Sequence, residues 1–471
     1  MTAFLPLICT LLLGIVFIFK FFGISIFKEK SPTGLPNGNM GWPLIGETLG
    51  FLKSHNSNSI GTFLQEHCSR YGRIFKSHLF GRPTIVSCDL ELNIFILQNE
   101  GRLFQSSYPK PVHDILGKLS MMLVSGEIHK KLRSIAVSFI NASKSRPDFL
   151  HYVDNSSISL VDSWKSKRQV FFFKEAKEFT FYIMLKNLLN MDPEDSVAAK
   201  ILEDFLTFMK GFVSLPLQIP GTAYAKAVKA RRRISLTLQD IIMKKRENMM
   251  SGTNARDFVD ELLAEVCLND EERVSILLDL LLAGYETTSG LLALVVYFLA
   301  HSPSSLQSLQ EEHQALRKTK KEGEPLNWED YKKMEFTSHV INEALRCGNL
   351  VKFVHREALK DVQFKEYVIP GGWQVLPILS APHLDPSLHQ HSLEFNPWRW
   401  ADPSTNRKVT PYGGGLRICP GTEIGKLEIA FFLHHFVLNL RWKTEVDESP
   451  ILCPYLDFKR GLVLEIEQIE E

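Results

Sequence analysis

The chain has 471 residues, of which 45% are hydrophobic and 23% charged, a composition typical of a globular protein. Its 54 lysine and arginine residues nearly balance 53 aspartate and glutamate residues, for a formal net charge of +1. This balance gives no indication of a nucleic-acid partner, and we expect none. The 7 cysteines are scattered without paired spacing, which is typical of a reducing compartment and argues against a disulfide framework.

The N-terminal segment is strongly apolar. It runs over residues 3–19 and resumes over 21–27, which together are long enough to cross a bilayer. The basic residues Lys20 and Lys28 lie within or after this run, whereas those of a cleaved signal peptide precede it. Positive charge on the C-terminal side of the apolar run would keep the chain that follows it in the cytosol. We therefore predict a single transmembrane anchor over residues 1–28.

A stretch rich in helix-breaking residues follows the anchor. Residues 29–50 contain proline and glycine at many positions, so they cannot form a continuous helix, and they are suited to a hinge between the membrane and the body. From residue 51 to 471 there is no second linker, repeat or low-complexity tract. We predict one large domain over this range.

Hydrophobic periodicity predicts that this domain is mainly α-helical with a small β-sheet part. Helical spacing is found over residues 197–213, 223–246, 274–301, 308–318, 331–347 and 424–436. Strand-like runs occupy residues 73–80, 83–87 and 362–375. The most apolar of the helical segments contains Asp279 and Glu286, whose charges would be costly inside a bilayer. We interpret it as a buried core helix rather than a second membrane span.

A glycine-rich loop near the C-terminus carries a single cysteine. The glycines at 413–415 can adopt positive φ and let the backbone pass close beneath a flat ligand. The apolar run after Gly421 predicts a helix whose N-terminus faces Cys419 and favours its thiolate, a ligand that promotes O–O cleavage at a haem iron. Arg417 can pair with a haem propionate. Taken alone, the loop is also compatible with a tight turn around a buried free cysteine.

An acid and an alcohol adjoin in the predicted core helix, at Glu286 and Thr287. The hydroxyl of Thr287 could hydrogen-bond to bound oxygen and hold water, and the carboxylate of Glu286 could relay protons inward. Gly284 would leave space for a ligand. We predict that this helix forms one side of an oxygen-activating site.

Three further sites carry charged or titratable residues. Glu343 and Arg346 fall on one helical face at i and i+3, and His129 and Arg133 do so at i and i+4. Exposed pairs of this spacing contribute only about 0.3 to 0.5 kcal/mol, so each pair alone indicates a solvated helix face. Arg356, taken alone, likewise indicates an ordinary surface charge. Their order along the chain and their spacing, taken together, are more informative than any one of these residues.

In that order, the segments resemble those of the cytochrome P-450 monooxygenases. Residues 412–421 resemble the family's F-x-x-G-x-R-x-C-x-G loop, with Tyr412 in place of Phe. Residues 343–346 match its E-x-x-R, and 395–400 match F-x-P-x-R-[FW]. Residues 129–133 resemble W-x-x-x-R, with His in place of Trp. The resemblance implies the family's fold, which is mainly α with a small β-sheet domain, behind one N-terminal transmembrane helix.

The resemblance also implies a haem b cofactor, O2 as a substrate and NADPH-derived electrons from an NADPH-cytochrome reductase. It implies that Cys419 is the axial ligand of the iron, that Glu286 and Thr287 are catalytic, and that the propionates contact His129, Arg133, Arg356 and Arg417. It implies a structural network that locks the haem loop, formed by Glu343, Arg346 and Arg399. The protein would be a single-pass protein of the endoplasmic reticulum membrane with a cytosolic catalytic domain.

Similarity over nearly the whole chain extends to plant enzymes that hydroxylate steroids and triterpenoids. The segments that carry it are residues 38–50, 80–86, 123–126, 220–222 and 370–377. The resemblance is closest to the brassinosteroid C-22 hydroxylases. It implies C-22 hydroxylation of the side chain of campesterol- or campestanol-type sterols, with the position set by the shape of an apolar pocket.

Two alternatives remain open from the sequence. The chain could oxidise another terpenoid, such as a triterpenoid or abscisic acid. It could also be a membrane-anchored haem or sterol binder without turnover. The pair Glu286 and Thr287 argues against a passive binder, because such a protein has no need of a proton relay.

Overall fold

A computed structural model describes residues 34–42, 45–250, 257–452 and 455–469, and for residues 249 and 250 it describes the backbone alone. The predicted anchor, residues 1–28, and the first part of the predicted hinge lie outside the described residues. The described part of the hinge packs against the sheet. The amide of Lys76 donates to the carbonyl of Asn37 at 2.9 Å, and Gly38 bridges to the same residue. The folded domain therefore begins before residue 51, earlier than predicted.

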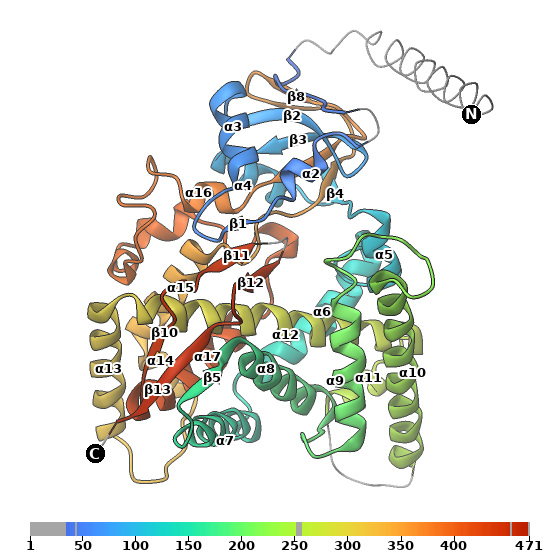
Figure 1. Cartoon of the computed structure of the whole chain (residues 1–471). Helices are drawn as coiled ribbons and strands as arrows, with labels where there is room; N and C mark the ends of the chain where they lie inside the picture. Colours follow the sequence, from blue (N-terminus) through green and yellow to red (C-terminus); the bar gives the residue numbers. More distant parts are fainter. Residues whose placement is uncertain (1–33, 43–44, 251–256, 453–454, 470–471) are drawn as a thin grey trace, which may run out of the picture.

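The described chain forms a sheet-containing part and a larger helical part (Figure 1). The helices are α2 (Thr48–Phe51), α3 (Thr62–Tyr71), α4 (Leu90–Gln98), α5 (Lys110–Leu116), α6 (Gly126–Ser143), α7 (Pro147–Trp164), α8 (Phe172–Leu189), α9 (Ser196–Met209), α10 (Ala223–Met250), α11 (Phe258–Ala264), α12 (Asp270–Ala300), α13 (Pro303–Lys318), α14 (Trp328–Lys333), α15 (Glu335–Gly348), α16 (Ser380–His383) and α17 (Thr422–Asn439). Short 3-10 helices are η1 (Pro397–Ala401), η2 (Pro403–Lys408) and η3 (Gly415–Arg417). The prediction of a mainly α-helical domain is confirmed.

The strands of the described residues form four small sheets. A five-stranded sheet has the order β2 (Ile74–Leu79), β3 (Arg82–Ser87), β9 (Gln374–Pro377), β6 (Arg356–Ala358) and β4 (Phe104–Ser106). The others are β1 (His55–Asn56) with β11 (Pro450–Leu452) and β12 (Leu456–Phe458), β10 (Leu440–Thr444) with β13 (Val463–Gln468) and β5 (Gln169–Phe171), and β7 (Val362–Phe364) with β8 (Tyr367–Ile369). In the large sheet β4 and β6 are antiparallel, with Ser106 opposite Arg356. This pairing brings the chain after α4 beside the start of β6.

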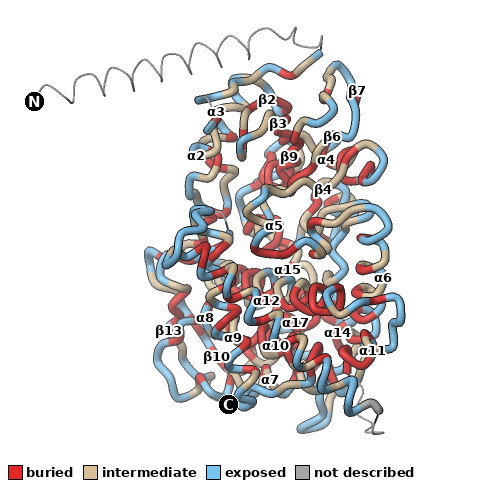
Figure 2. The backbone as a smooth tube through the Cα atoms, turned by 90° about the vertical axis from the view of Figure 1, so that its right-hand side faces the viewer, coloured by how far each residue is buried: buried red, intermediate tan, exposed pale blue. Residues whose placement is uncertain are grey.

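Helix α12 is the central element of the helical part (Figure 1). Asn269 caps its N-terminus and forms a capping box with Glu272. Among the described residues it is the one helix long and apolar enough to cross a membrane, but 67% of its apolar window is buried inside the protein. It packs against α8, α10, α15 and α17, and buried positions concentrate along these helices (Figure 2). These contacts support the interpretation of α12 as a core helix.

The predicted helices and strands are found, with changed boundaries. The segment 331–347 is not one helix, because Met334 leaves helical geometry between α14 and α15, with φ −82° and ψ 64°. The helix predicted over 197–213 ends at Met209. The helix predicted over 308–318 starts earlier, at Pro303, because a proline is well placed in a first helical turn.

Candidate functional site: a cysteine loop beside an arginine cluster

The cysteine loop owes its path to two of its three glycines. Gly413 and Gly415 have φ of 73° and 61°, whereas Gly414 is extended, with φ −174°. A Cβ on Gly415 would lie 2.0 Å from the carbonyl oxygen of Leu97 at the end of α4. Side chains are therefore excluded where the loop crosses α4, and η3 is held against that helix.

Cys419 lies between this loop and the N-terminus of α17. Its amide donates to the carbonyl of Tyr412 at 3.0 Å, and its side chain is accessible to solvent. The surrounding protein nevertheless raises the pKa of the thiol, while the amide of Gly421, the hydroxyl of Thr422 and the charge of Arg133 lower it. Gly421 and Thr422 lower the pKa as predicted for a helix N-terminus, although burial outweighs these groups and Arg133 together.

Tyr412, which stands where the family pattern has Phe, brings an additional hydroxyl group into the protein. Its hydroxyl is buried and has no hydrogen-bond partner among the described residues. Burial raises the pKa of Tyr412, and the neighbouring Cys419 acts in the same direction. Lys426 Nζ lies over the ring, 5.6 Å from its centroid. The ring thus fills the position of the family's Phe, with one unsatisfied polar atom.

A buried carboxylate lies at the centre of the predicted propionate contacts. Glu100 follows α4, and its Oε1 lies 2.6 Å from Arg417 Nε, while its Oε2 lies 2.8 Å from Arg356 Nε. His129 and Arg133 reach the same cluster from one face of α6. The structure thus brings together the four side chains that the sequence predicts to contact haem propionates.

His129 and Arg133 differ in what they can offer a carboxylate. Burial lowers the pKa of His129 to about 4, and the charges of Arg417 and Arg133 act in the same direction, so its imidazole is neutral at pH 7. Arg133 donates from Nη2 to the carbonyl of Ile418, beside the cysteine. No carboxylate among the described residues pairs with Arg133, so its charge is available to an anion.

Arg417 directs its guanidinium at the protein. Besides the bond from Nε to Glu100, Nη1 donates to the carbonyl of Met121 at 2.8 Å. Nη2 donates to the carbonyl of Val124 at 2.5 Å and to Ser125 Oγ at 3.2 Å. The sequence predicts a direct propionate contact for Arg417. Because each of its nitrogens already has a protein acceptor, its effect on a propionate would be through its charge.

The charge of this cluster fits a haem. Arg133, Arg356 and Arg417 are three guanidinium groups against the single carboxylate of Glu100, which leaves two positive charges beside the cysteine loop. Buried or half-buried charge of one sign is costly without a counter-charge. The two propionates of a haem would supply it, and the accessible thiol of Cys419 adjoins the same cluster.

Helix α12 carries the residues that the sequence predicts for the oxygen-activating side of the site. Beyond its first turn, the exposed residues of this helix are Ala283 and Thr287, and Thr287 Oγ1 donates to the carbonyl of Ala283 at 2.6 Å. Gly425 of α17 packs on Thr288, the residue after Thr287, since a Cβ on Gly425 would lie 3.4 Å from Thr288 Oγ1. This contact sets α12 beside the helix that follows Cys419. Ala283 and Thr287 therefore lie on the exposed part of α12, next to the residue that contacts α17.

The acid of the predicted proton relay lies on the same helix. Burial raises the pKa of Glu286, while Lys177 of α8, 3.7 Å away, lowers it. The prediction that Gly284 leaves space for a ligand is wrong. A Cβ on Gly284 would lie 2.3 Å from the Met184 side chain, so this glycine serves the packing of α12 on α8.

Glu343 and Arg346 of the predicted network are fully buried, and Arg399 is 11% exposed. Arg346 binds Glu343 through two nitrogens at 2.9 and 2.8 Å, and Arg399 Nε lies 2.9 Å from the same carboxylate. Trp400 Nε1 donates to it at 2.9 Å. Burial raises the pKa of Glu343, but its bonds to Arg346 and the charge of Arg399 outweigh this and lower it.

The network reaches the cysteine loop through a histidine. Arg346 Nη1 donates to the carbonyl of His383 at 2.7 Å, and the amide of Thr410 donates to His383 Nε2 at 3.0 Å. Thr410 begins the turn that leads into the loop, and its carbonyl accepts from Gly413. A hydrogen-bonded path therefore joins the charged core of α15 to the loop.

Sequence reasoning missed three residues of this site. Glu100 carries no motif and follows an apolar helix, so that its position between two arginines depends on the pairing of β4 with β6. Lys177 is distant in sequence from Glu286. Trp400 lies inside the recognised segment 395–400, where its indole N–H could have been noted as a donor for a buried acid.

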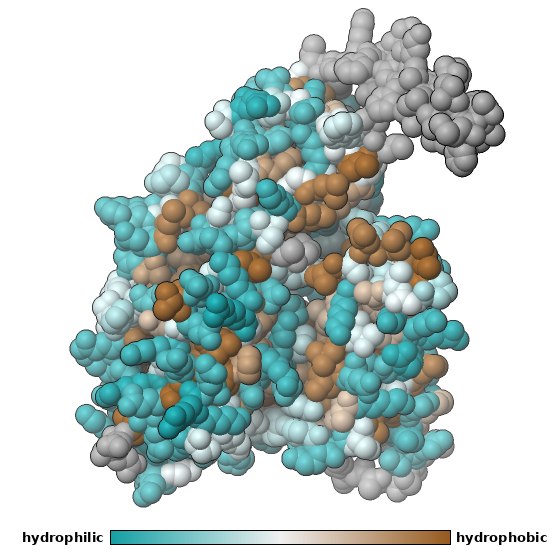
Figure 3. Space-filling view, in the orientation of Figure 1, coloured by the Kyte–Doolittle hydropathy of each residue, from teal (hydrophilic) through white to brown (hydrophobic). Residues whose placement is uncertain are grey.

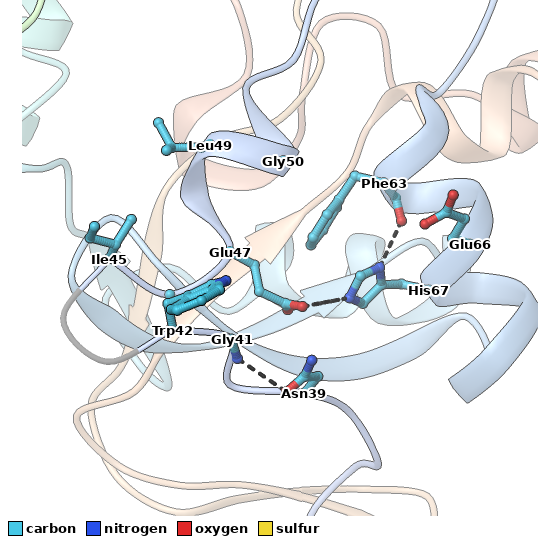
Figure 4. Close-up of a pocket in the computed structure, with 11 residues that line it drawn as sticks. Asn39, Gly41, Trp42, Ile45, Glu47, Leu49, Gly50, Phe63, Glu66 and His67 are labelled. Atoms are coloured by element: carbon cyan, nitrogen blue, oxygen red, sulfur yellow. Dashed lines mark hydrogen bonds and ion pairs between the residues drawn. The ribbon is translucent and has the colours of Figure 1, made fainter. Parts of the chain in front are cut away.

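A separate pocket of about 800 Å³ lies near the start of the described chain (Figure 4). Its lining includes Trp42, Leu49 and Phe63, and Glu47 pairs with His67 at 3.2 Å beside it. No residue of the cysteine loop lines this pocket. It is a feature of the sheet-containing part rather than of the candidate site.

Comparisons with known proteins agree with this geometry. Residues 36–469 match the sequence model of the family described as Cytochrome P450. Cytochrome P450 724B1 of Oryza sativa subsp. japonica is 55% identical over 92% of each chain. Cholesterol 22-monohydroxylase CYP90B52 of Paris polyphylla is 44% identical over 98% of this chain and 99% of its own. The solved structure titled retinoic acid bound cyanobacterial CYP120A1 has a TM-score of 0.82 and 26% identity, over 93% of this chain and 100% of its own.

The chain therefore belongs to the cytochrome P450 family. It is a haem-thiolate monooxygenase with the fold of that family, and both predictions are confirmed. Family membership implies a haem iron and O2, with electrons supplied by a reductase.

The close approach of Gly415 to Leu97 gives a first prediction. We expect Gly415→Ala to displace the loop, because the new Cβ would meet a backbone oxygen and φ is positive. Haem content per folded protein should fall at least about tenfold, measured by the Soret absorbance of the purified protein. Gly413→Ala is the matched control. Its φ is also positive but its Cβ would meet nothing within 4 Å, so it should keep its haem. Equal haem content in the two variants would contradict this account.

The buried network gives a second prediction. Glu343→Gln leaves the charge of Arg346 without its partner in a position of 0% exposure, so we expect a loss of about 3 to 5 kcal/mol in stability. Thermal or urea unfolding of the haem-loaded protein measures it. Glu127→Gln, which breaks the exposed i, i+3 pair with Lys130, should change stability by less than about 1 kcal/mol. A Glu343→Gln protein as stable as this control would show that the network is not structural.

Proposed function

We propose that the protein hydroxylates the side chain of campesterol- or campestanol-type sterols at C-22, as a step of plant brassinosteroid biosynthesis. The observation that carries this proposal is the full-length relation to a protein named as a cholesterol 22-monohydroxylase, together with a site of the matching chemistry. A bound haem would supply the O2-activating chemistry. The chain would hold that haem, orient the sterol and deliver protons.

In this proposal Cys419 would hold the haem iron through its sulfur, and the exposure of this residue beside the N-terminus of α17 supports the role. His129, Arg133 and Arg356 would hold the propionates, with the charge of Arg417 beside them. The neutral imidazole of His129 is a hydrogen-bonding group, whereas Arg133 and Arg356 supply charge. Glu343, Arg346 and Arg399 keep the loop in place.

Proton delivery is assigned to Glu286 and Thr287. Thr287 is exposed toward the site, where its hydroxyl can hold a water molecule near the reacting atoms. Glu286 lies next to it on α12, and its ion pair with Lys177 places a second titratable group behind it. Burial raises the pKa of Glu286, and a pKa shifted by its surroundings is typical of groups that exchange protons in a site.

A membrane location in the endoplasmic reticulum is part of the proposal, with residues 1–28 as the anchor and an NADPH-cytochrome reductase as the electron donor. The described surface supports membrane contact. Exposed apolar residues gather ahead of and within α2 and in the loop between α9 and α10 (Figure 3). They are Trp42, Ile45 and Leu49, and Val213, Leu215, Leu217 and Ile219. Such patches on a soluble domain indicate contact with an apolar surface, through which a sterol could enter.

The proposal is tested with a panel of ligands and one variant. Campestanol, campesterol and cholesterol should each shift the Soret band of the purified protein, whereas a pentacyclic triterpenoid and abscisic acid should not. With reductase and NADPH, the sterols should give 22-hydroxylated products. A shift with the triterpenoid or abscisic acid alone would replace the sterol assignment with the alternative terpenoid.

Thr287→Ala separates an enzyme from a passive binder. It should bind the sterol with an unchanged spectral shift but form at least about tenfold less product per NADPH consumed, because the hydroxyl that holds water is lost. Thr287→Ser should restore the product. Sterol binding by the wild type without any product would support the non-catalytic alternative.

A further inference from the structure

Two cysteines that lie apart in the sequence are brought together where α3 packs against β2 of the five-stranded sheet (Figure 1). Cys68 lies in the last turn of α3, and its carbonyl accepts from the amide of Gly72 at 3.0 Å. Arg73 follows directly, and its carbonyl accepts from the amide of Cys88, the residue after β3, at 2.8 Å. The same short turn therefore fixes the backbone of both cysteines.

The side chains of Cys68 and Cys88 also contact each other. Cys88 belongs to a hydrophobic cluster with Leu64, Phe75 and Val86 among its members, and Cys68 packs against this cluster. The thiol of Cys88 donates a hydrogen bond to the sulfur of Cys68. Both side chains are free thiols. Because a disulfide needs its two sulfur atoms at close range, thiols that already touch can be bridged with little movement of the backbone.

The two thiols differ in exposure and in acidity. Cys88 is 4% exposed, whereas Cys68 is half-buried. The hydrogen bond from Cys88 lowers the pKa of Cys68, and the charges of Arg73 and His67 act in the same direction, while burial opposes them. The same hydrogen bond and burial raise the pKa of Cys88. Cys68 is therefore the thiol that ionises first and the one that a dissolved oxidant reaches.

We propose that Cys68 and Cys88 form a peroxide-responsive thiol pair, which hydrogen peroxide oxidises to a disulfide. The sulfur of Cys68 attacks one oxygen of the peroxide, the O–O bond breaks, and the leaving hydroxide takes the proton that Cys68 released and becomes water. The sulfur of Cys88 then attacks the sulfenic acid at Cys68, and the hydroxyl leaves with the proton of Cys88 as a second water. The two thiols lose two electrons, and the peroxide gains them.

The surroundings support the second step. Lys352 Nζ donates to His55 Nε2 at 2.8 Å, and its charge lies close enough to lower the pKa of Cys88, as does that of Arg73. These two cations stabilise the sulfur of Cys88 as it gives up its proton. An enzyme that passes electrons to O2 also works beside this oxidant, because two electrons and two protons convert O2 to hydrogen peroxide.

The pair is tested on the haem-loaded full-length protein, without sterol, by brief treatment with hydrogen peroxide. The remaining thiols are then alkylated and the protein is digested with trypsin, which places the cysteines in residues 54–70 and 77–102 because a proline follows Arg82. Mass spectrometry should find these two peptides joined, lighter by two hydrogen atoms than their sum, and dithiothreitol should separate them. A reduced CO spectrum before and after treatment reports on the haem site.

Three variants assign the roles. In Cys88→Ala, oxidation of Cys68 should stop at the sulfenic acid, which dimedone captures. In Cys68→Ser, oxidation of Cys88 should be at least about tenfold slower than in the wild type. Cys267→Ser is the matched control, because it removes an exposed thiol that donates to the carboxylate of Glu265 at 3.9 Å. It should form the linked peptides at the wild-type rate.

Recovery of Cys68 and Cys88 without a link after peroxide treatment would overturn the proposal. Oxidation of Cys267 as fast as Cys68 in the wild type would also contradict it, since exposure alone would then explain the reactivity. A link that forms only as the CO spectrum is lost would belong to the unfolded chain and would overturn it as well. If Cys88→Ala does not fold with haem, the wild type and Cys68→Ser decide the matter. Because no sterol is added, the result is independent of the proposed function.

Discussion

The site depends on a surplus of positive charge that the protein does not neutralise by itself. Arg356 and Arg417 pair with one carboxylate, Glu100, while a third arginine of the same cluster, Arg133, has no carboxylate partner among the described residues. Such an arrangement is costly in an empty protein, because desolvated charge of one sign repels. It becomes favourable when an anionic ligand with two carboxylates fills the space. Cofactor binding and the stability of this region are therefore expected to be linked.

A second buried charge network holds the loop from the other side. Glu343 and Arg346 are fully buried, and the path through His383 to Thr410 ties them to the start of the cysteine loop. The glycine at 415 fixes the end of the loop against α4. The position of Cys419 is thus set by contacts that involve no cofactor. Pre-organisation of this kind lets a ligand bind without paying for ordering of the loop.

Much of the fold and of the site could be predicted from the sequence, because helical periodicity and short motifs are local signals. The run 274–301 identified the central helix, and the spacing of Glu343 and Arg346 identified a pair whose burial the structure shows. The break at Met334 was missed, since the apolar pattern continues across it. Glu100 and Lys177 could not be predicted, because each is brought to the site by packing between distant segments.

Arg417 and Gly284 show that a motif is insufficient to predict what a residue contacts. A motif gives the residue type and the position in the chain, whereas the partner of a side chain is fixed by what packs beside it. Arg417 meets the backbone of residues 121–125, and Gly284 meets Met184, so both serve contacts within the protein.

The most direct test of this account is turnover of campestanol under ¹⁸O2, with the purified full-length protein, reductase and NADPH. The account predicts a product that carries one ¹⁸O atom in a hydroxyl group at C-22. A product without the label would contradict O2 activation at the Cys419 site, and a labelled hydroxyl at another carbon would contradict the assignment of C-22.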